Sequence, residues 1–188
     1  MKQYLKLIRV HHYMKNLLVL AALACSGQFF DEEKLIPGVM GFLAFCMISS
    51  VIYIINDISD ADNDRLHPLK SARPIASGAV SPKKAALLAA LLLILSLVFN
   101  FVAYKLYSSI LLLIFLLLNI AYSLGLKDIP ILDICILAAG FLIRVMYGAI
   151  ISGIEISNWL YLTVIAMAFY FSLGKRRNEL RRMGEAST

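Results

Sequence analysis

Six apolar stretches dominate this sequence of 188 residues. They cover approximately 16–30, 36–55, 84–104, 106–124, 131–151 and 157–173. A helix that crosses a bilayer needs about 20 mostly apolar residues, so the first stretch is short and needs tilt or local thinning of the bilayer. The strict alternation of a β-barrel is absent, which leaves helices to satisfy the backbone. We therefore predict an all-α, multi-pass membrane helical bundle with six transmembrane helices.

The composition agrees with lipid as the solvent. Charged residues make up 16% of the chain and hydrophobic residues 61%, whereas roughly a quarter of the residues in an ordinary soluble domain are charged. A soluble domain of this length has too much surface to cover with so few charges. The net charge of +6 therefore indicates the lipid bilayer as partner and no nucleic acid. The oligomeric state stays open.

The basic residues predict the orientation. Fifteen of the eighteen Lys and Arg residues lie in the N-terminal arm, in the loop 56–84, at Lys127 and in the C-terminal tail. Such an excess belongs on the cytoplasmic side of a membrane. Both termini are thus expected to be cytoplasmic, which agrees with an even number of spans. Only one inward loop, 56–84, is long, and long polar loops are where function concentrates.

Carboxylates gather where the second apolar stretch ends. On a continuous helix Asn56, Asp57, Asp60 and Asp64 fall within about 100° of one another, while Asp62 points elsewhere. Carboxylates on one face repel each other, so a positive group is expected there. Oxygen ligands from a few carboxylates, with the remaining positions open, bind Mg²⁺ alongside substrate phosphates. We predict a Mg²⁺ site at Asp57, Asp60 and Asp64; the alternative is an acidic helix end solvated at the membrane surface.

Two basic residues follow this cluster. Lys70 and Arg73 would face the phosphates of a bound substrate, or else serve as ordinary positively charged anchors on the cytoplasmic side. His67 could join the acidic face. Its neighbour Pro68 suggests the end of a helix, so a capping role is equally open.

These residues carry a resemblance. Asn56-Asp57-x-x-Asp60-x-x-x-Asp64, followed by His-Pro-x-Lys-x-x-Arg-Pro-Ile-Ala-Ser-Gly at 67–78, resembles the first aspartate-rich motif of the UbiA-type intramembrane prenyltransferase superfamily. The resemblance implies an all-helical membrane transferase that binds a diphosphate through Mg²⁺ and opens its polar site toward the cytoplasm. It extends from Tyr4 to Leu180. Members usually have about nine spanning helices, so 1–188 is interpreted as one UbiA-like domain holding the N-terminal two-thirds of that fold.

The second motif of the superfamily differs here. At the matching place stands Gly174-Lys175-Arg176-Arg177-Asn178-Glu179-Leu180, in which one carboxylate and three cations replace an aspartate pair. This is similar to the branch that transfers phosphoribose from phosphoribosyl diphosphate to a polyprenyl phosphate. The other segments that resemble this branch are Arg9, Lys15-Asn16, Tyr122-Ser123-x-x-x-Lys127, Leu132-Asp133 and Arg144-Val145-x-x-Gly148.

The resemblance implies a reaction without a protein nucleophile, in a bacterial-type cytoplasmic membrane with the active site facing the cytoplasm. Asp57, Asp60 and Asp64 would be the catalytic and metal-binding residues, with Mg²⁺ as cofactor, and the site would hold a polyprenyl phosphate and a diphosphate-bearing donor. The expected substrate-binding residues are Asn56, Lys15, Lys70, Arg73, Tyr122, Lys127, Asp133, Lys175, Arg176 and Glu179.

Other interpretations remain open. The same fold could move a prenyl group from its diphosphate to an aromatic or lipid acceptor, and six spans could also form a non-catalytic membrane subunit or a transporter. The basic segment after residue 174 could be an anchor only, and Tyr122 an interfacial residue. Asp133 lies inside an apolar stretch, where an unpartnered carboxylate is expensive, so a function is favoured there. Arg144 is expected to reach the outer face or to pair with Glu155.

Overall fold

A computed structural model describes residues 2–102, 106–126 and 129–185, and this part of the chain contains helices and no strand. The all-α prediction is therefore confirmed for the described residues. In chain order the helices are α1 (Lys2–Ile8), the 3₁₀-helix η1 (Val10–Leu20), α2 (Ala21–Cys25), α3 (Glu32–Ser59), α4 (Ala61–Leu66), the 3₁₀-helix η2 (Lys70–Ala72), α5 (Pro82–Val102), α6 (Leu106–Ser123), α7 (Pro130–Ser152) and α8 (Asn158–Glu185).

Four of these helices, α3, α5, α6 and α7, are long and apolar enough to cross a membrane among the described residues. They correspond to the predicted stretches 36–55, 84–104, 106–124 and 131–151. Helix α8 contains the predicted stretch 157–173, but Asn158 and Lys175 closely bound its apolar part and it does not meet the same criterion. The structure thus supports four of the six predicted spans by length and composition.

The structure does not confirm one continuous crossing helix over 16–30. This segment forms the end of η1 and the short helix α2, and the chain then turns at Gly27, whose φ of 73° ends regular structure. The physical reason lies in a close contact with α7. A Cβ atom at Gly148 would lie 1.6 Å from the carbonyl oxygen of Val19, so the backbone of η1 lies directly on that glycine.

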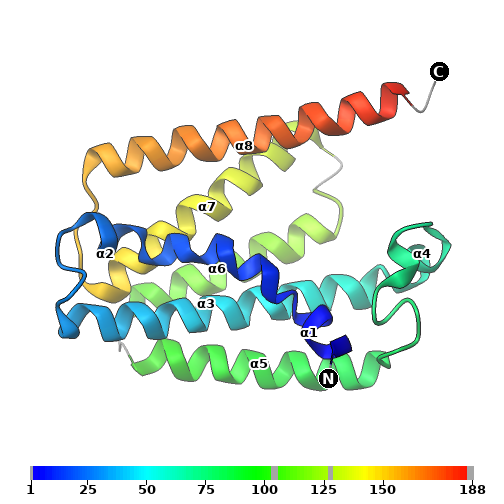
Figure 1. The fold of residues 1–188 in the computed structure, drawn as a ribbon, viewed down its shortest axis with the longest axis horizontal. Coiled ribbons are helices and arrows are strands. Elements are labelled where there is room, and N and C mark those ends of the chain that lie inside the picture. Colours follow the sequence, from blue (N-terminus) through cyan, green and yellow to red (C-terminus); the bar gives the residue numbers. More distant parts are fainter. Residues whose placement is uncertain (1, 103–105, 127–128, 186–188) are drawn as a thin grey trace.

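Helices α3, α5 and α8 run along the long axis of the molecule, and α7 crosses it obliquely (Figure 1). Helix α3 packs on α5 along much of its length, and α7 contacts α8, α3, η1 and α6. The α3–α5 connection with α4, the α6–α7 connection and the C-terminal end of α8 lie at one end, and the α2–α3 and α7–α8 connections lie at the other (Figure 1). Connections that were predicted to lie on the same side of the membrane therefore lie at the same end of the bundle.

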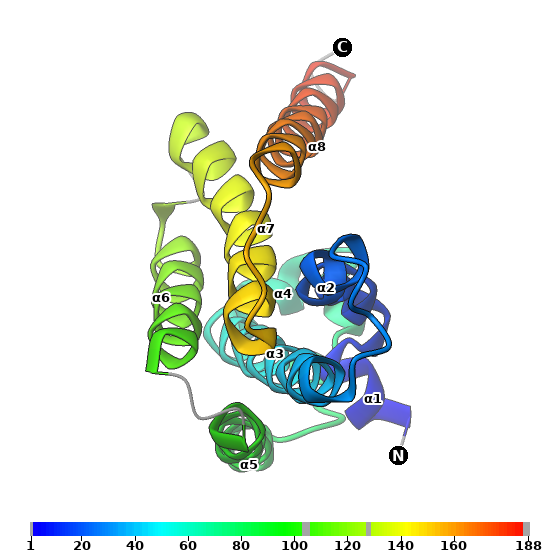
Figure 2. The ribbon, with the colours of Figure 1, turned by 90° about the vertical axis from the view of Figure 1, so that its left-hand side faces the viewer.

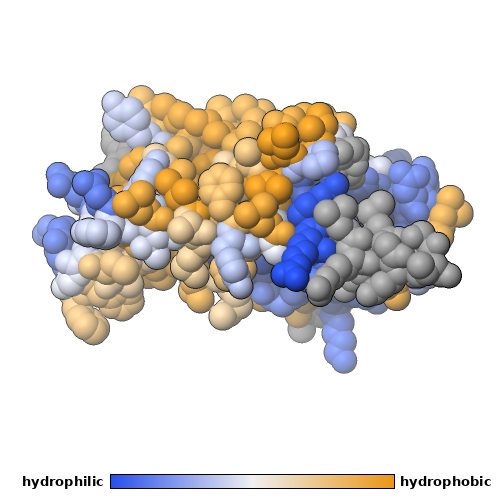
Figure 3. Space-filling model, turned by 90° about the horizontal axis from the view of Figure 1, so that it is seen from above, coloured by the Kyte–Doolittle hydropathy of each residue, from blue (hydrophilic) through white to orange (hydrophobic). Residues whose placement is uncertain are grey.

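Helix α8 stands apart from α3 and α5, and it contacts the rest of the bundle mainly through α7 (Figure 2). Seen from the side of α8, the middle of the molecule is mostly hydrophobic and the hydrophilic residues gather toward its ends (Figure 3). Large exposed apolar side chains such as Trp159, Leu162 and Tyr170 lie on α8. An apolar belt of this kind suits a lipid environment.

One part of the core fixes the loop between α4 and α5. Ile75 and Val80 from this loop are buried with Leu7 of α1 and with Val51 and Ile54 of α3. Apolar burial stabilises by roughly 25 cal/mol per Å² removed from water. The loop is therefore held against α1 and α3, and it carries the residues that meet the aspartates.

Candidate functional site

Asp60 interrupts the helix that carries the aspartates. Helix α3 ends at Ser59, α4 begins at Ala61, and Asp60 caps both helices with φ −90° and ψ 2°. The continuous acidic face predicted from 56 to 64 is therefore corrected to two helices that meet at Asp60. Asp57 and Asp64 are both 2% exposed. Asp62 points elsewhere as predicted, because it is exposed and pairs with Arg65 at 2.6 Å.

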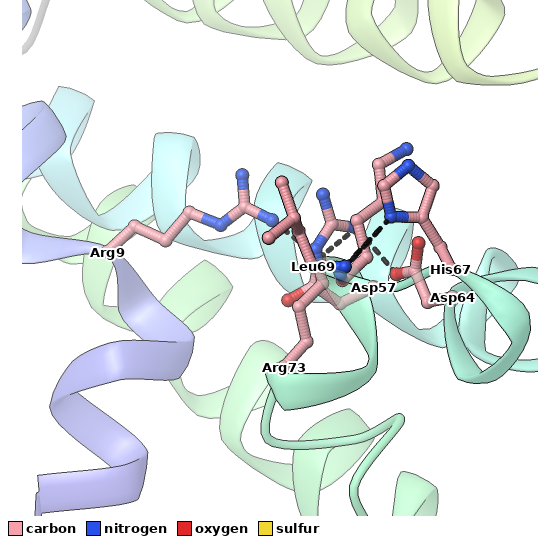
Figure 4. A network of polar contacts seen from close by, with 7 residues as sticks. Arg9, Asp57, Asp64, His67, Leu69 and Arg73 are labelled. Atoms are coloured by element: carbon pink, nitrogen blue, oxygen red, sulfur yellow. Dashed lines mark hydrogen bonds and ion pairs between the residues drawn. The ribbon is translucent and has the colours of Figure 1, made fainter.

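Two arginines bind the buried pair of carboxylates (Figure 4). An Nη atom of Arg9 lies 2.6 Å from Oδ1 of Asp57. An Nη atom of Arg73 lies 3.2 Å from the same Oδ1 and 2.6 Å from Oδ2 of Asp64. One nitrogen of Arg73 thus bridges Asp57 and Asp64, and charged pairs at such distances are among the stronger hydrogen bonds of proteins. We call these four residues the arginine–aspartate cluster.

Hydrogen bonds to the backbone carbonyl groups on either side of Arg73 hold this residue in position. The N–H of Val80 donates to the carbonyl oxygen of Pro74 at 2.9 Å, which closes the loop just after Arg73. Nζ of Lys6 donates to the carbonyl oxygen of Ala72 at 2.9 Å, which ties α1 to the residue before it. Arg73 is therefore placed by contacts on both sides.

Arg9 reaches the cluster from an unusual backbone position. Its φ of 53° and ψ of 52° place it in the left-handed region between α1 and η1, which few non-glycine residues adopt. Its guanidinium carbon lies 4.7 Å from the centre of the Tyr53 ring, and the ring of His12 lies 5.1 Å from the same ring. The sequence linked Arg9 to the site only by resemblance, and no periodicity connects two residues 48 positions apart.

Two open cavities of about 190 Å³ each flank the cluster. The first, the arginine cavity, is lined by Lys6, Arg9, His11, His12, Asp57, Arg73 and Pro74. The second, the aspartate cavity, is lined by Asp60, Asn63, Asp64, His67 and Lys70. Both cavities place cations beside carboxylates. Anionic oxygens and a divalent cation can therefore be bound at neighbouring positions.

Histidines at these cavities have distinct environments. The ring of His12 packs against the ring of His11, with 4.2 Å between the ring centres, and against the ring of Tyr53. Nδ1 of His67 accepts hydrogen bonds from the N–H groups of Leu69 at 3.2 Å and of Lys70 at 3.4 Å. His67 thus caps the chain after α4, which confirms one of its two predicted roles.

The residues fit Mg²⁺ that is bound together with phosphate. Among the described residues no group of three His, Cys, Asp or Glu side chains is gathered as a metal site. Asp57 and Asp64 nevertheless meet at one nitrogen of Arg73, and Asp60 lines the same cavity as Asp64. Mg²⁺ in proteins usually takes one or two carboxylates plus substrate phosphates and waters. Asn56, predicted as a further contact, is half-buried on α3 directly before Asp57.

A second cluster joins three predicted site residues from α6, α7 and α8. The hydroxyl of Tyr122 donates to Oδ1 of Asp133 at 2.8 Å, and Nζ of Lys175 lies 3.1 Å from that oxygen and 3.0 Å from the hydroxyl. Oδ2 of Asp133 is buried and has no hydrogen-bond partner among the described residues. Oδ2 of Asp133 is therefore a buried acceptor that can take a further hydrogen bond. Arg176 is half-buried beside this cluster on α8.

Two of the expected substrate-binding residues cannot be placed. Lys127 lies outside the described residues, as does the side chain of Glu179. Lys15 is exposed on η1, whereas its neighbour Asn16 is buried.

Arg144 binds within the bundle, and its expected pairing with Glu155 is wrong. Its Nε donates to Oδ1 of Asn16 at 3.0 Å and an Nη donates to the carbonyl oxygen of Gly140 at 2.6 Å. The guanidinium carbon lies 4.9 Å from the centre of the Phe115 ring and 5.3 Å from that of Phe45. The guanidinium group of Arg144 is therefore bound by two carbonyl oxygens and by the faces of aromatic rings, and not by a carboxylate from the described part of the chain.

Comparison with known proteins agrees with this geometry. Residues 17–183 match the model of the UbiA prenyltransferase family. The decaprenyl-phosphate phosphoribosyltransferase of Mycolicibacterium smegmatis is 40% identical over 182 residues, covering 94% of this chain and 57% of that protein. Its counterpart in Corynebacterium glutamicum is 34% identical, with 94% and 54% covered. The chain thus spans a little over half the length of these two relatives.

A solved structure supports the fold. The UbiA homolog from Archaeoglobus fulgidus, bound to DMAPP and Mg²⁺, superposes with a TM-score of 0.71 at 24% identity and covers 90% of this chain and 61% of that one. At this level of identity the likeness concerns the fold alone. It agrees with an integral membrane protein built from packed helices.

Proposed function

Because this chain belongs to the UbiA prenyltransferase family, we propose that it forms the donor site of a membrane transferase that moves phosphoribose from phosphoribosyl diphosphate to a polyprenyl phosphate. The observation that carries this proposal is the arginine–aspartate cluster, in which Arg73 bridges Asp57 and Asp64. The relatives named decaprenyl-phosphate phosphoribosyltransferase support the choice of substrates.

The cluster suits a donor rich in anionic oxygens. Guanidinium groups bind phosphate oxygens as well as carboxylates, so a bound diphosphate competes with Asp57 and Asp64 for Arg9 and Arg73. The two carboxylates, with Asp60 beside them, would then hold Mg²⁺. When bound, Mg²⁺ neutralises charge on the departing diphosphate. Lys6 and Lys70 at the two cavities add positive charge for the same phosphates.

The transfer needs no nucleophile from the protein. An anionic oxygen of the lipid phosphate attacks C1 of the ribose, and a C1–O bond to the lipid phosphate forms. The C1–O bond to the diphosphate breaks, and its electron pair leaves with the diphosphate, so no proton has to move. The side chains of this site act by positioning the two anions and by stabilising the charge that develops on the leaving group.

We further propose that the chain is a single domain over 1–188 that crosses a cytoplasmic membrane six times. Helix α8 would supply one crossing, and η1 with α2 another. At about 2.0 Å per residue for a 3₁₀-helix and about 1.5 Å for an α-helix, η1 and α2 together span roughly 30 Å, the thickness of a hydrocarbon core. Irregular backbone is tolerated at membrane depth where protein surrounds it. The basic connections favour the cytoplasmic side for the arginine–aspartate cluster.

A binding experiment tests the donor. The thermal unfolding of the detergent-solubilised chain is measured with phosphoribosyl diphosphate or with farnesyl diphosphate, each with and without Mg²⁺, because a ligand of the folded state raises the apparent stability. We expect a Mg²⁺-dependent shift with the ribosyl donor. Asp64→Asn and Arg73→Gln should abolish this shift, whereas Asp62→Asn, which lies outside the cluster, should keep it.

The other outcomes have definite meanings. A shift with farnesyl diphosphate alone would favour the alternative function, transfer of a prenyl group to an aromatic or lipid acceptor. A full shift in Asp64→Asn would refute the assignment of this carboxylate to the donor site. No shift with either donor would favour a non-catalytic membrane subunit or a transporter.

A further inference from the structure

A third cavity, of about 400 Å³, lies between η1, α7 and α8. It is lined by Lys15, Leu137, Phe141, Phe171, Ser172 and Lys175. Two aromatic rings and a leucine make most of its wall apolar, and two lysines supply positive charge. Its size falls within the range of about 300–1,000 Å³ that is usual for small-molecule sites. We call it the lysine cavity.

A buried hydroxyl in the wall of the lysine cavity is left without a partner. Ser172 is 2% exposed, and its Oγ forms no hydrogen bond among the described residues. A buried hydroxyl that is not hydrogen-bonded costs about 1–3 kcal/mol, and such groups are uncommon in native proteins. Ser172 lines the lysine cavity, so a molecule bound there lies next to this unpartnered hydroxyl.

The charges around the lysine cavity call for an anion. Among the described residues no carboxylate forms an ion pair with Lys15 or with Arg144. Lys15 and Lys175 line the cavity together, and Lys175 is paired with Asp133 at 3.1 Å. An anion at this place would relieve the repulsion between the two lysines.

The lysine cavity also lies close to the donor site. The 3₁₀-helix η1 contributes His11 and His12 to the arginine cavity and Lys15 to the lysine cavity. Three residues of a 3₁₀-helix span about 6 Å. An anionic oxygen beside Lys15 is thus within a short distance of a substrate bound at the arginine–aspartate cluster.

We propose that the lysine cavity binds the acceptor, with the phosphate monoester between Lys15 and Lys175 and the first part of the lipid chain on Phe141 and Phe171. This inference rests on the proposed function and adds the place of the second substrate. Ser172 donates its hydroxyl hydrogen to a phosphate oxygen. The apolar wall distinguishes this cavity from the two cavities of the donor site, whose linings are mostly charged or polar.

Binding of a short lipid phosphate tests this assignment. Farnesyl monophosphate, farnesol and inorganic phosphate are titrated onto the detergent-solubilised chain, and affinity is measured by calorimetry. We expect farnesyl monophosphate to bind at least tenfold more tightly than either of the other two, because only it fills both the cationic and the apolar parts. Lys15→Gln should weaken its binding about tenfold or more, as expected for the loss of a charged hydrogen bond. Ser172→Ala should weaken it by a smaller factor.

Matched variants separate this inference from the proposed function. Lys83→Gln removes an exposed lysine at the start of α5 that lines none of the three cavities, and should leave both affinities unchanged. Arg73→Gln should abolish the Mg²⁺-dependent binding of phosphoribosyl diphosphate and spare farnesyl monophosphate, while Lys15→Gln should do the reverse. Loss of farnesyl monophosphate binding in Arg73→Gln but not in Lys15→Gln would overturn the lysine cavity and leave the donor site intact. Failure of both ligands to bind the unchanged chain would overturn both proposals.

Discussion

Gly148→Ala is expected to push the backbone of η1 away from α7. A Cβ atom at this position would lie 1.6 Å from the carbonyl oxygen of Val19, and real Cβ atoms essentially never come within 3.0 Å of another heavy atom, so η1 has to retreat by about 1.4 Å. A backbone carbonyl cannot turn aside as the end of a flexible side chain can. The displaced segment carries Asn16 and Lys15, so the change reaches the lysine cavity.

The size of the effect follows from two opposing contributions. Overpacking costs about 1–3 kcal/mol, and a clash with backbone belongs at the upper end, about 3 kcal/mol. Alanine is about 1 kcal/mol more favourable than glycine within a helix. The free energy of unfolding should therefore fall by about 2 kcal/mol, which lowers the Tm of a protein of this size by roughly 4–8 °C.

Thermal unfolding in detergent, followed by far-ultraviolet circular dichroism, measures this change. Gly174→Ala is the matched control, because a Cβ atom at this helical glycine of α8 would meet nothing within 4 Å. This control gains only the helix preference of alanine, so its Tm should rise by roughly 2–4 °C. If Gly148→Ala is as stable as the unchanged chain, or more stable, η1 does not lie against α7 as described.

A further change probes a buried polar contact. Tyr147→Phe removes a buried hydrogen bond of 3.0 Å to Asn100 and should destabilise by about 1 kcal/mol. Tyr107→Phe, at an exposed tyrosine of α6, should leave the Tm unchanged, and equal Tm values for both variants would refute a role for the Asn100 contact.

The long apolar helices could be predicted because their length is fixed by the bilayer. The stretch 106–124 agrees with α6 (Leu106–Ser123), and 131–151 agrees with α7 (Pro130–Ser152), to within one residue at each end. The stretch 16–30 departs from one continuous α-helix for a tertiary reason. An apolar stretch is compatible with burial both as an α-helix and as a 3₁₀-helix, so hydropathy does not distinguish the two. The close approach of Val19 to Gly148 involves residues far apart in the sequence.

The candidate site was predictable in its residue types and not in its pairing. Helical periodicity grouped Asp57 with Asp64 and left Asp62 out; Asp57 and Asp64, on two different helices, do meet at Arg73, and Asp62 pairs with Arg65. Periodicity could not show the break at Asp60, because an isolated aspartate is compatible with both a helix and a cap. Nor could it pair Arg9 with Asp57, which depends on how α1 and α3 pack.

The partner of Arg144 could not be predicted from the sequence either. The nearest acidic residue along the chain suggested a partner for Arg144, but the bundle supplies Asn16, 128 positions away. Ring faces and a carbonyl oxygen complete its surroundings. Closeness in the sequence does not predict which side chains contact each other where helices pack side by side.

The arginine–aspartate cluster has a consequence for what can enter the site. Two carboxylates and two guanidinium groups together carry no net charge. A lone cation bound to the carboxylates would leave two arginines uncompensated, and a lone diphosphate bound to the arginines would leave two buried carboxylates uncompensated, which is costly away from water. A cation and an anion that arrive together leave the electrical balance nearly unchanged. The metal and the donor are therefore expected to bind as a salt, each raising the affinity for the other.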